Sequence, residues 1–154
     1  MNLFKKLFSK KEKTEISENP SDKSSYFPSD DAPIDEKFTY MFNKNGGKFL
    51  YCLSMDEIFE AFQNILEENE ISEKDVYCIN QRLGSKFNST KFNFKEPQNN
   101  SFFLTTCESL IAKNGSILFS SHQIKEKKLN ELPSKFIVFA TTSQLTDTIS
   151  EGMR

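Results

Sequence analysis

The order of apolar segments along the chain constrains its fold more than any other feature. Apolar residues recur at helical spacing within residues 34–66, and after residue 75 they gather in short runs typical of β-strands. The strands first alternate with helices and later follow one another closely. This order predicts an α/β domain with three layers and a mixed sheet.

The strongest helical signal begins at Ser54. Ser54 and Glu57 have the spacing of a capping box, in which the hydroxyl accepts one free N–H and the carboxylate another. An apolar stripe follows, made of Ile58, Phe59, Phe62, Ile65 and Leu66. Residues 35–45 show similar spacing and stop at Gly46-Gly47, and residues 81–87 predict a short third helix.

Six segments have the composition of β-strands. They are residues 48–53, 75–79, 91–94, 101–105, 116–119 and 135–140. Asn114-Gly115 is typical of a tight turn, because these residues tolerate positive φ. Thr141-Thr142-Ser143 follows the most hydrophobic strand and is expected to open a helix.

The composition changes near residue 33. Residues 1–33 carry a basic start and then an acidic, Ser/Pro-rich stretch, so they predict a disordered N-terminal leader before an α/β domain at 34–154. Four apolar residues of the leader could share a helical face, and they are Leu3, Phe4, Leu7 and Phe8. Contact with an anionic membrane surface is therefore an alternative to a solvated tail, although the tail is favoured.

Charge and cysteine usage exclude several classes of partner and cofactor. A net charge of -2 argues against nucleic acid as the main partner. Cys52, Cys78 and Cys107 lie far apart, without the close spacing of zinc or iron–sulfur ligands, and each lies in or beside an apolar run. We expect buried free thiols, no metal, no cofactor and a cytoplasmic location. No apolar stretch approaches the ~20 residues of a membrane span.

No catalytic residue can be assigned from a motif. The chain has one histidine, His122, in a polar segment typical of a surface loop, and no glycine-rich nucleotide fingerprint. Glu108 is the one acid in the apolar run 107–112. A carboxylate at a helix start is its favoured role, with a general acid or base as the alternative.

Three segments in the second half of the chain resemble the LUD-domain family. The first is Cys107-Glu108-Ser109-Leu110-Ile111-Ala112-Lys113-Asn114-Gly115-Ser116-Ile117-Leu118. The second is Asn130-Glu131-Leu132-Pro133-Ser134-Lys135-Phe136-Ile137-Val138, which is similar to the family's Leu-Pro element and central strand. Gln144 stands where the family begins its next helix. The match covers residues 103–145, and the layout from about residue 35 is similar.

This resemblance implies a NagB/RpiA/CoA transferase-like fold. It also implies a bacterial non-metal subunit or accessory factor in L-lactate utilisation, which oxidises lactate to pyruvate alongside separate iron–sulfur subunits. Lys113-Asn114, Lys128 and Phe136 depart from the family pattern, which indicates a divergent subfamily. The family's domain normally continues past Gln144, so we expect residues 34–154 to be C-terminally truncated and the sheet to lack a strand.

Two other function classes stay open. One is a non-catalytic small-anion-binding or regulatory module of the same fold, and the other is an independent enzyme of the isomerase or acyl-transfer type. For a small carboxylate or phosphate we expect a site where two loops meet. Its residues would be Gly115, Ser116, Lys128, Thr141, Thr142 and Ser143, with free N–H groups at a helix start. The alternative is that these hydroxyls only cap a helix and close a turn.

Overall fold

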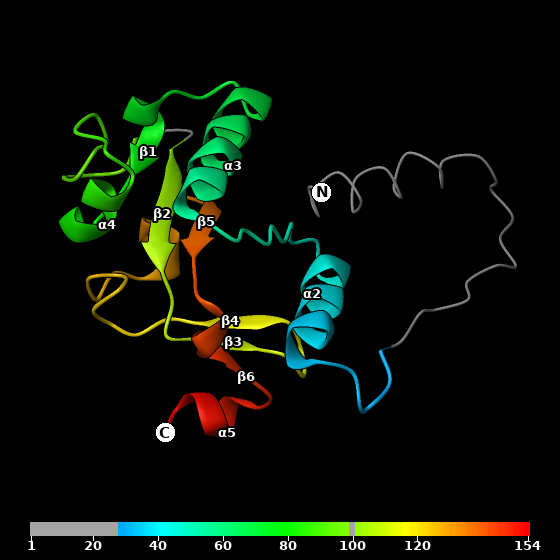
Figure 1. Cartoon of the computed structure of the whole chain (residues 1–154). Helices are drawn as coiled ribbons and strands as arrows, with labels where there is room; N and C mark the ends of the chain where they lie inside the picture. The colour runs from blue at the N-terminus through cyan, green and yellow to red at the C-terminus, as the bar shows by residue number, and fades with distance from the viewer. Residues whose placement is uncertain (1–27, 99–100) are drawn as a thin grey trace, which may run out of the picture.

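The computed structural model describes residues 28–98 and 101–154, which form a mixed α/β structure with two small sheets (Figure 1). The α/β prediction is therefore confirmed. The apolar residues predicted to share a helical face, from Leu3 to Phe8, lie outside the described residues, as does most of the predicted leader. Within the described part, no helix is long and apolar enough to cross a membrane.

The helices and strands have the following bounds. The α-helices are α2 (Ile34–Lys44), α3 (Met55–Glu68), α4 (Gln81–Lys86) and α5 (Ile149–Gly152). Short 3-10 turns are η1 (Glu73–Asp75), η2 (Leu129–Glu131) and η3 (Thr142–Gln144). The strands are β1 (Val76–Tyr77), β2 (Phe102–Thr106), β3 (Ser109–Ile111), β4 (Ser116–Leu118), β5 (Lys135–Phe139) and β6 (Leu145–Thr146).

The two longer helices form for the reasons that the sequence predicts. Ser54 Oγ accepts the N–H of Glu57 at 3.2 Å, which caps the start of α3. The Glu57 carboxylate reaches back to the N–H of Leu53 at 2.7 Å, one residue further than an ideal capping box. The helix buries Phe62 and Leu66 from its apolar stripe. Helix α2 buries Phe38 and ends before Gly46-Gly47, as predicted.

The first sheet is parallel and has the order β1-β2-β5. The central strand β2 pairs with β5 along its whole length, from Phe102 opposite Lys135 to Thr106 opposite Phe139. On the edge of β1 that faces away from β2, Tyr77 forms one isolated parallel bridge with Asn93. This bridge is all that the described residues show of the strand predicted at 91–94.

The second sheet has the order β4-β3-β6 and lies beyond the carboxyl ends of β2 and β5 (Figure 1). The strands β3 and β4 are antiparallel, whereas β3 and β6 are parallel. The sequence prediction of a single mixed sheet is therefore wrong in detail, because a parallel sheet and a smaller mixed sheet share the strands. The prediction also missed β3, which occupies residues assigned to a helix start.

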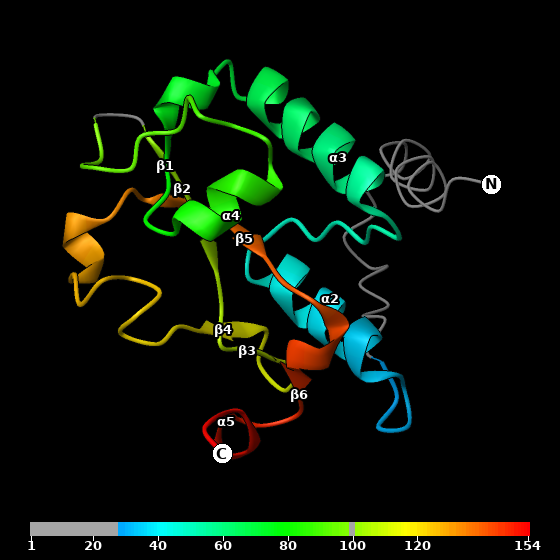
Figure 2. The same cartoon turned by 60° about the vertical axis from the view of Figure 1, so that its left-hand side comes forward.

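Apolar side chains fill three regions around the two sheets. One face of the parallel sheet packs against α3 and α4 (Figure 2), in a cluster of Phe62, Leu66, Val76, Cys78, Leu83, Phe92 and Leu104. The other face holds Tyr77, Phe103 and Leu132, so the segment 120–132 covers it rather than an α-helix. A third cluster joins α2 to the second sheet through Phe38, Cys107, Leu110 and Ala112. Three layers are thus present, but only one outer layer is built of α-helices.

The strand predicted at residues 48–53 does not form. Residues 45–54 run between α2 and α3 without regular secondary structure. Phe49 packs on the cluster around Phe38, at 5.9 Å between ring centroids, so this part of the segment is anchored by its side chain. Phe49 to Cys52 are half-buried, as a strand would be, but no strand among the described residues pairs with them. The strand-like composition of residues 48–53 was therefore not sufficient for them to pair as a strand.

Candidate functional site

The carboxyl ends of β1, β2 and β5 lie at one edge of the parallel sheet, because parallel strands end on the same side. Polar residues follow two of these ends, Asn80 after β1 and Thr141 after β5, whereas the buried Cys107 follows β2. Asn80 caps α4, since its Oδ1 accepts the N–H groups of Arg82 at 3.0 Å and Leu83 at 3.2 Å. This edge is where open α/β sheets generally bind ligands.

The connections that leave β1 and β2 cross opposite faces of the parallel sheet. After β1 it crosses the sheet face that carries α4 and returns at Asn93, on the outer side of β1. After β2 it crosses the opposite face through residues 120–132 and returns as β5, on the outer side of β2. If the single bridge at Asn93 is counted as a strand position, the two crossovers leave in opposite directions on opposite faces and form a topological switch point, which in open α/β sheets marks the ligand crevice.

Gln144 ties the ends of two parallel strands together at this edge. Its side-chain Nε2 donates to the backbone carbonyl of Cys107, directly after β2. Its Oε1 accepts the N–H of Thr141, after β5, at 2.9 Å. The Thr141 N–H is therefore occupied, contrary to the prediction of a wholly free helix start. The sequence prediction also expected a helix here, and the structure has only the single 3-10 turn η3.

Some hydrogen-bonding groups of η3 stay available to a ligand. The hydroxyls of Thr141 and Ser143 lie 2.7 Å apart, and both residues are exposed. No bond to another described residue occupies the backbone N–H groups of Thr142 and Ser143. One of these hydroxyls donates to the other, so one hydroxyl proton and two N–H groups on this exposed turn can donate to a small carboxylate or phosphate. The turn is too short to add a helix dipole of any size.

Gly115 and Ser116 lie at the other end of the second sheet. Gly115 is the last residue of the turn after β3, and Ser116 is the first residue of β4. The strand β6, which pairs with β3 on its other side, begins directly after η3. The length of the paired strands therefore separates this turn from Thr141. Gly115 is buried, with φ of +69°, and an added Cβ would lie 2.6 Å from the backbone of Met41 and Phe42 in α2. The close backbone approach at Gly115 serves packing on α2, and the structure places the two predicted loops at opposite ends of the β3–β6 pair.

Lys128 lies on a third part of the molecule. It is exposed and precedes η2, where its backbone N–H donates to the Glu131 carboxylate at 2.7 Å. The turn η2 leads into the amino end of β5, whereas Thr141 follows the carboxyl end of the same strand. The predicted six-residue set is thus split into three places, of which only Thr141, Thr142 and Ser143 lie at the carboxyl edge.

The buried thiols have no reactive environment. Cys78 and Cys107 are free and fully buried, and desolvation raises the pKa of each thiol to about 11. Cys52 is half-buried, and burial followed by the Glu57 charge raises its pKa as well. The packing interpretation is confirmed for Cys78 and Cys107. Within residues 28–98 and 101–154, no group of side chains could hold a metal ion.

The other residues considered for chemistry lie in solvent. His122 is exposed in the segment after β4, as predicted. Glu108 is exposed directly before β3, rather than at a helix start, and its carboxylate accepts the amide of Gln123 at 3.3 Å. This bond joins β3 to the segment 120–132.

Comparisons with known proteins leave the family open. No protein-family model matches the chain, and neither a curated protein nor a solved structure does. The functional assignment therefore rests on the residues themselves. Sequence reasoning noted Gln144 only for its position, although a Gln three residues after a Thr is the spacing of a capping pair and could have indicated its structural role.

Proposed function

We propose that this chain is a divergent LUD-domain protein that acts as a metal-free subunit or accessory factor in L-lactate utilisation. In this proposal, separate iron–sulfur subunits carry electrons while lactate is oxidised to pyruvate. The NagB/RpiA/CoA transferase-like class of the fold belongs to the same proposal. The parallel sheet with its carboxyl-edge switch point is compatible with that class.

The main support is that the three segments of the resemblance occupy connected parts of the structure. The first segment contains β3, β4 and their turn. Leu132-Pro133 leads directly into β5, and Leu132 is buried against the parallel sheet. Gln144 joins the ends of β2 and β5. Residues 103–145 thus form the central part of the fold, where a family pattern would be most constrained by packing.

Growth on lactate tests this proposal directly. Deleting the gene from its source organism should prevent growth on L-lactate as the sole carbon source and leave growth on pyruvate unchanged, because the defect lies before pyruvate. Reintroducing the gene should restore growth. Undiminished growth of the deletion strain on L-lactate would count against the proposal. Purification of the tagged protein from lactate-grown cells should recover iron–sulfur subunits, which an untagged control should not.

A second candidate function is a small-anion-binding module without chemistry of its own. The exposed hydroxyl pair of Thr141 and Ser143, next to the unoccupied N–H groups of Thr142 and Ser143, favours it. The exposed carboxylate of Glu108 argues against this candidate function, because its negative charge would repel an anion. Glu108 directly follows Cys107, whose carbonyl accepts the side-chain amide of Gln144. The balance predicts weak binding of monoanions such as lactate rather than of multiply charged phosphate.

Thermal unfolding with added ligand tests the second candidate. Lactate or pyruvate at millimolar concentration should raise the melting temperature of the wild-type chain, and Thr141→Val with Ser143→Ala should remove that shift. The matched control is Ser120→Ala with Ser121→Ala, which removes two hydroxyls from a different loop. Lys128→Ala should leave the shift unchanged, since Lys128 lies near the opposite end of β5. No ligand-dependent shift in the wild type would leave η3 with a structural role only.

A further inference from the structure

The strand β5 leaves one edge of the parallel sheet open. It pairs with β2 alone, and no backbone hydrogen bond joins its outer edge to any residue of 28–98 or 101–154. Four of its five residues are apolar, and all four are half-buried: Phe136, Ile137, Val138 and Phe139. An unpaired edge with apolar side chains on both faces is a template for another strand.

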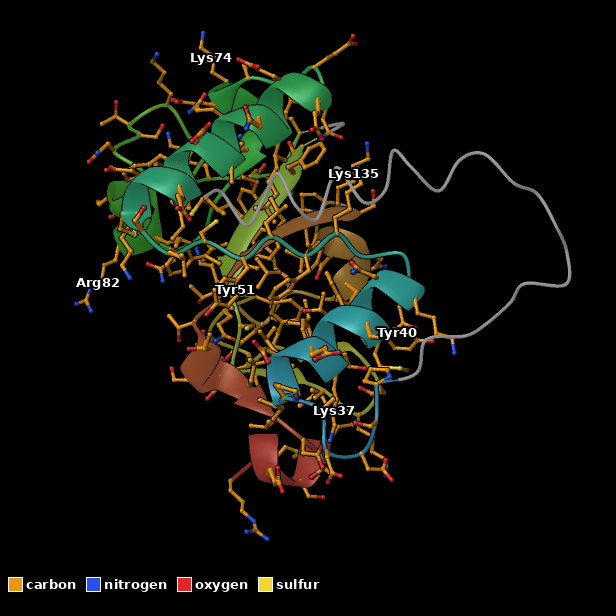
Figure 3. All side chains as sticks on the ribbon, turned by 45° about the vertical axis from the view of Figure 1, so that its right-hand side comes forward. Lys37, Tyr40, Tyr51, Lys74, Arg82 and Lys135 are labelled. Atoms are coloured by element: carbon orange, nitrogen blue, oxygen red, sulfur yellow. The ribbon has the colours of Figure 1, made fainter. Side chains whose placement is uncertain are left out.

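This edge lacks the devices that usually protect open strands. Natural edges carry Pro, a bulge, or a charged side chain that blocks pairing. The register of β5 with β2 runs without a bulge from Lys135 to Phe139, and Lys135 is its one charged residue. The Lys135 ammonium lies over the ring of Phe102 on β2, 5.1 Å from the centroid, at the start of the strand (Figure 3). Because Lys135 stands at one end of β5, the four residues after it have no charged side chain among them.

A second segment also has unused backbone groups. Residues 48–52 have the composition of a strand, yet no N–H of theirs has a hydrogen-bond partner among the described residues. This segment, which includes Tyr51, runs between α2 and α3 (Figure 3). Phe49 and Val138 pack on the same cluster around Phe38. The unpaired edge of β5 and the unpaired segment 48–52 therefore lie in the same region of the molecule.

Two cations indicate the chemistry of a strand that could pair with β5. Lys135 stands at the start of β5, and the ammonium of Lys86 lies 5.2 Å from the ring centroid of Phe139 at its end. A second copy fits poorly: antiparallel pairing centred on Ile137 would place Lys135 of one copy opposite Phe139 of the other, beside Lys86. Like charges placed opposite each other destabilise a strand pair. An added strand with acidic ends would meet both cations favourably.

We propose that the outer edge of β5 binds an extended segment of a partner polypeptide, apolar in its centre and acidic at both ends. The partner strand extends the parallel sheet, and its backbone pairs with the free N–H and C=O groups of β5. Its end carboxylates lie near Lys135 and Lys86. Backbone pairing supplies the affinity, and the two cations select the partner. This inference does not depend on the proposed role in lactate utilisation.

Peptide binding tests the proposal on the full chain. The probe is a fluorescent peptide of sequence Glu-Val-Thr-Val-Thr-Val-Glu, measured by fluorescence anisotropy. A twin with Lys at both ends should bind more weakly, and a twin with Pro in place of the central Val should not bind, because Pro breaks the ladder. Hydrogen exchange of the β5 amides should slow only with the acidic peptide. These contrasts use the wild-type protein, so they do not depend on the folding of a variant.

Charge reversal then assigns the site. Lys135→Glu with Lys86→Glu should weaken binding of the acidic peptide by about tenfold and favour the basic twin. The matched control, Lys74→Glu with Lys113→Glu, makes the same change of net charge away from β5 and should leave the order of binding unchanged. The proposal is overturned by equal binding of the acidic, basic and Pro peptides, or by no binding at millimolar concentration. A dimer that protects the β5 amides would assign the edge to self-pairing instead.

Discussion

The side chain of Gln144 bridges two strand ends that the backbone ladder leaves apart. Its Nε2 donates to the carbonyl of Cys107, and its Oε1 accepts the N–H of Thr141 at 2.9 Å. Pairing between β2 and β5 stops at Thr106 opposite Phe139. The same two chain segments pair again further along, as β3 and β6 of the second sheet, where Leu110 lies opposite Leu145. One amide thus substitutes for ladder hydrogen bonds across the gap and connects the two sheets.

Replacing Gln144 should destabilise the fold. Gln144→Ala leaves the Cys107 carbonyl and the Thr141 N–H without their partners, at a cost of about 1–3 kcal/mol in the free energy of unfolding. Urea unfolding measures the change. Gln63→Ala, on the exposed face of α3, should stay within about 0.5 kcal/mol of the wild type. Equal stability of the two variants would show that the bridge contributes nothing.

Substitution of two glycines should separate backbone strain from steric packing. Gly115 and Gly46 have φ of +69° and +91°, which strains any L-residue. An added Cβ at Gly46 has open space, but at Gly115 it would lie 2.6 Å from the α2 backbone. Gly46→Ala should cost about 1 kcal/mol, and Gly115→Ala at least about 3 kcal/mol, because α2 must move. Similar losses in thermal or urea unfolding would contradict the packing of the β3–β4 turn on α2.

The outcome at particular segments shows what the sequence can and cannot predict. The helix after Ser54 was predictable because its cap and its apolar stripe are both local signals. The strand β3 was missed because Ser109–Ile111 is too short to show a period, and its pairing with β6 depends on residues more than thirty positions away. Residues 48–53 show the reverse failure, since a strand needs a partner as well as a composition.

The candidate site was only partly predictable for the same reason. Thr141 and Ser143 follow the carboxyl end of β5, as chain order predicts, but β5 is an edge strand of the parallel sheet and the central strand is β2. Gly115 was assigned to the same site because glycine permits close approach of a backbone. The sequence does not say whether a ligand or a helix makes that approach, and here α2 does.

The two buried thiols should make stability fall at alkaline pH. The pKa of Cys78 and of Cys107 is raised from 9.0 to about 11 in the folded chain. Between these values the unfolded chain loses the thiol protons while the folded chain keeps them. Stability is thus fully present below pH 9 and decreases as the pH rises toward 11, by about 1–2 kcal/mol for each thiol.

Urea unfolding in reductant, at pH 7.5 and at pH 10.5, measures this decrease. The comparison is the Cys78→Ala, Cys107→Ala variant, which carries the same lysines and tyrosines as the wild type. The variant is expected to be less stable at both pH values and to lose less stability between them. If wild type and variant lose the same amount, the thiols do not contribute to the pH dependence.

Removal of the leader should leave the domain intact. Residues 1–27 carry little apolar mass beyond Leu3, Phe4, Leu7 and Phe8, and their charge is segregated into a basic and an acidic block, so they have little to contribute to a core. A chain that begins at Pro28 retains the bond from Lys37 Nζ to the carbonyl of Asp30 before α2. Its melting temperature should match that of the full chain. A decrease of more than a few degrees would mean that the leader packs on the domain.

The turn η3 also works as a spacer that sets the register of the second sheet. From Thr106 to Leu110 the chain advances four residues, whereas their partners Phe139 and Leu145 are six apart. A spacer one residue longer or shorter would set Gln144 or Thr146 opposite Leu110 and turn Leu145 away from the cluster around Phe38. The number of residues in this turn is therefore constrained, because one residue more or less moves each side chain of β6 to the other face of the sheet. This holds even though the residues of the turn lie on the surface.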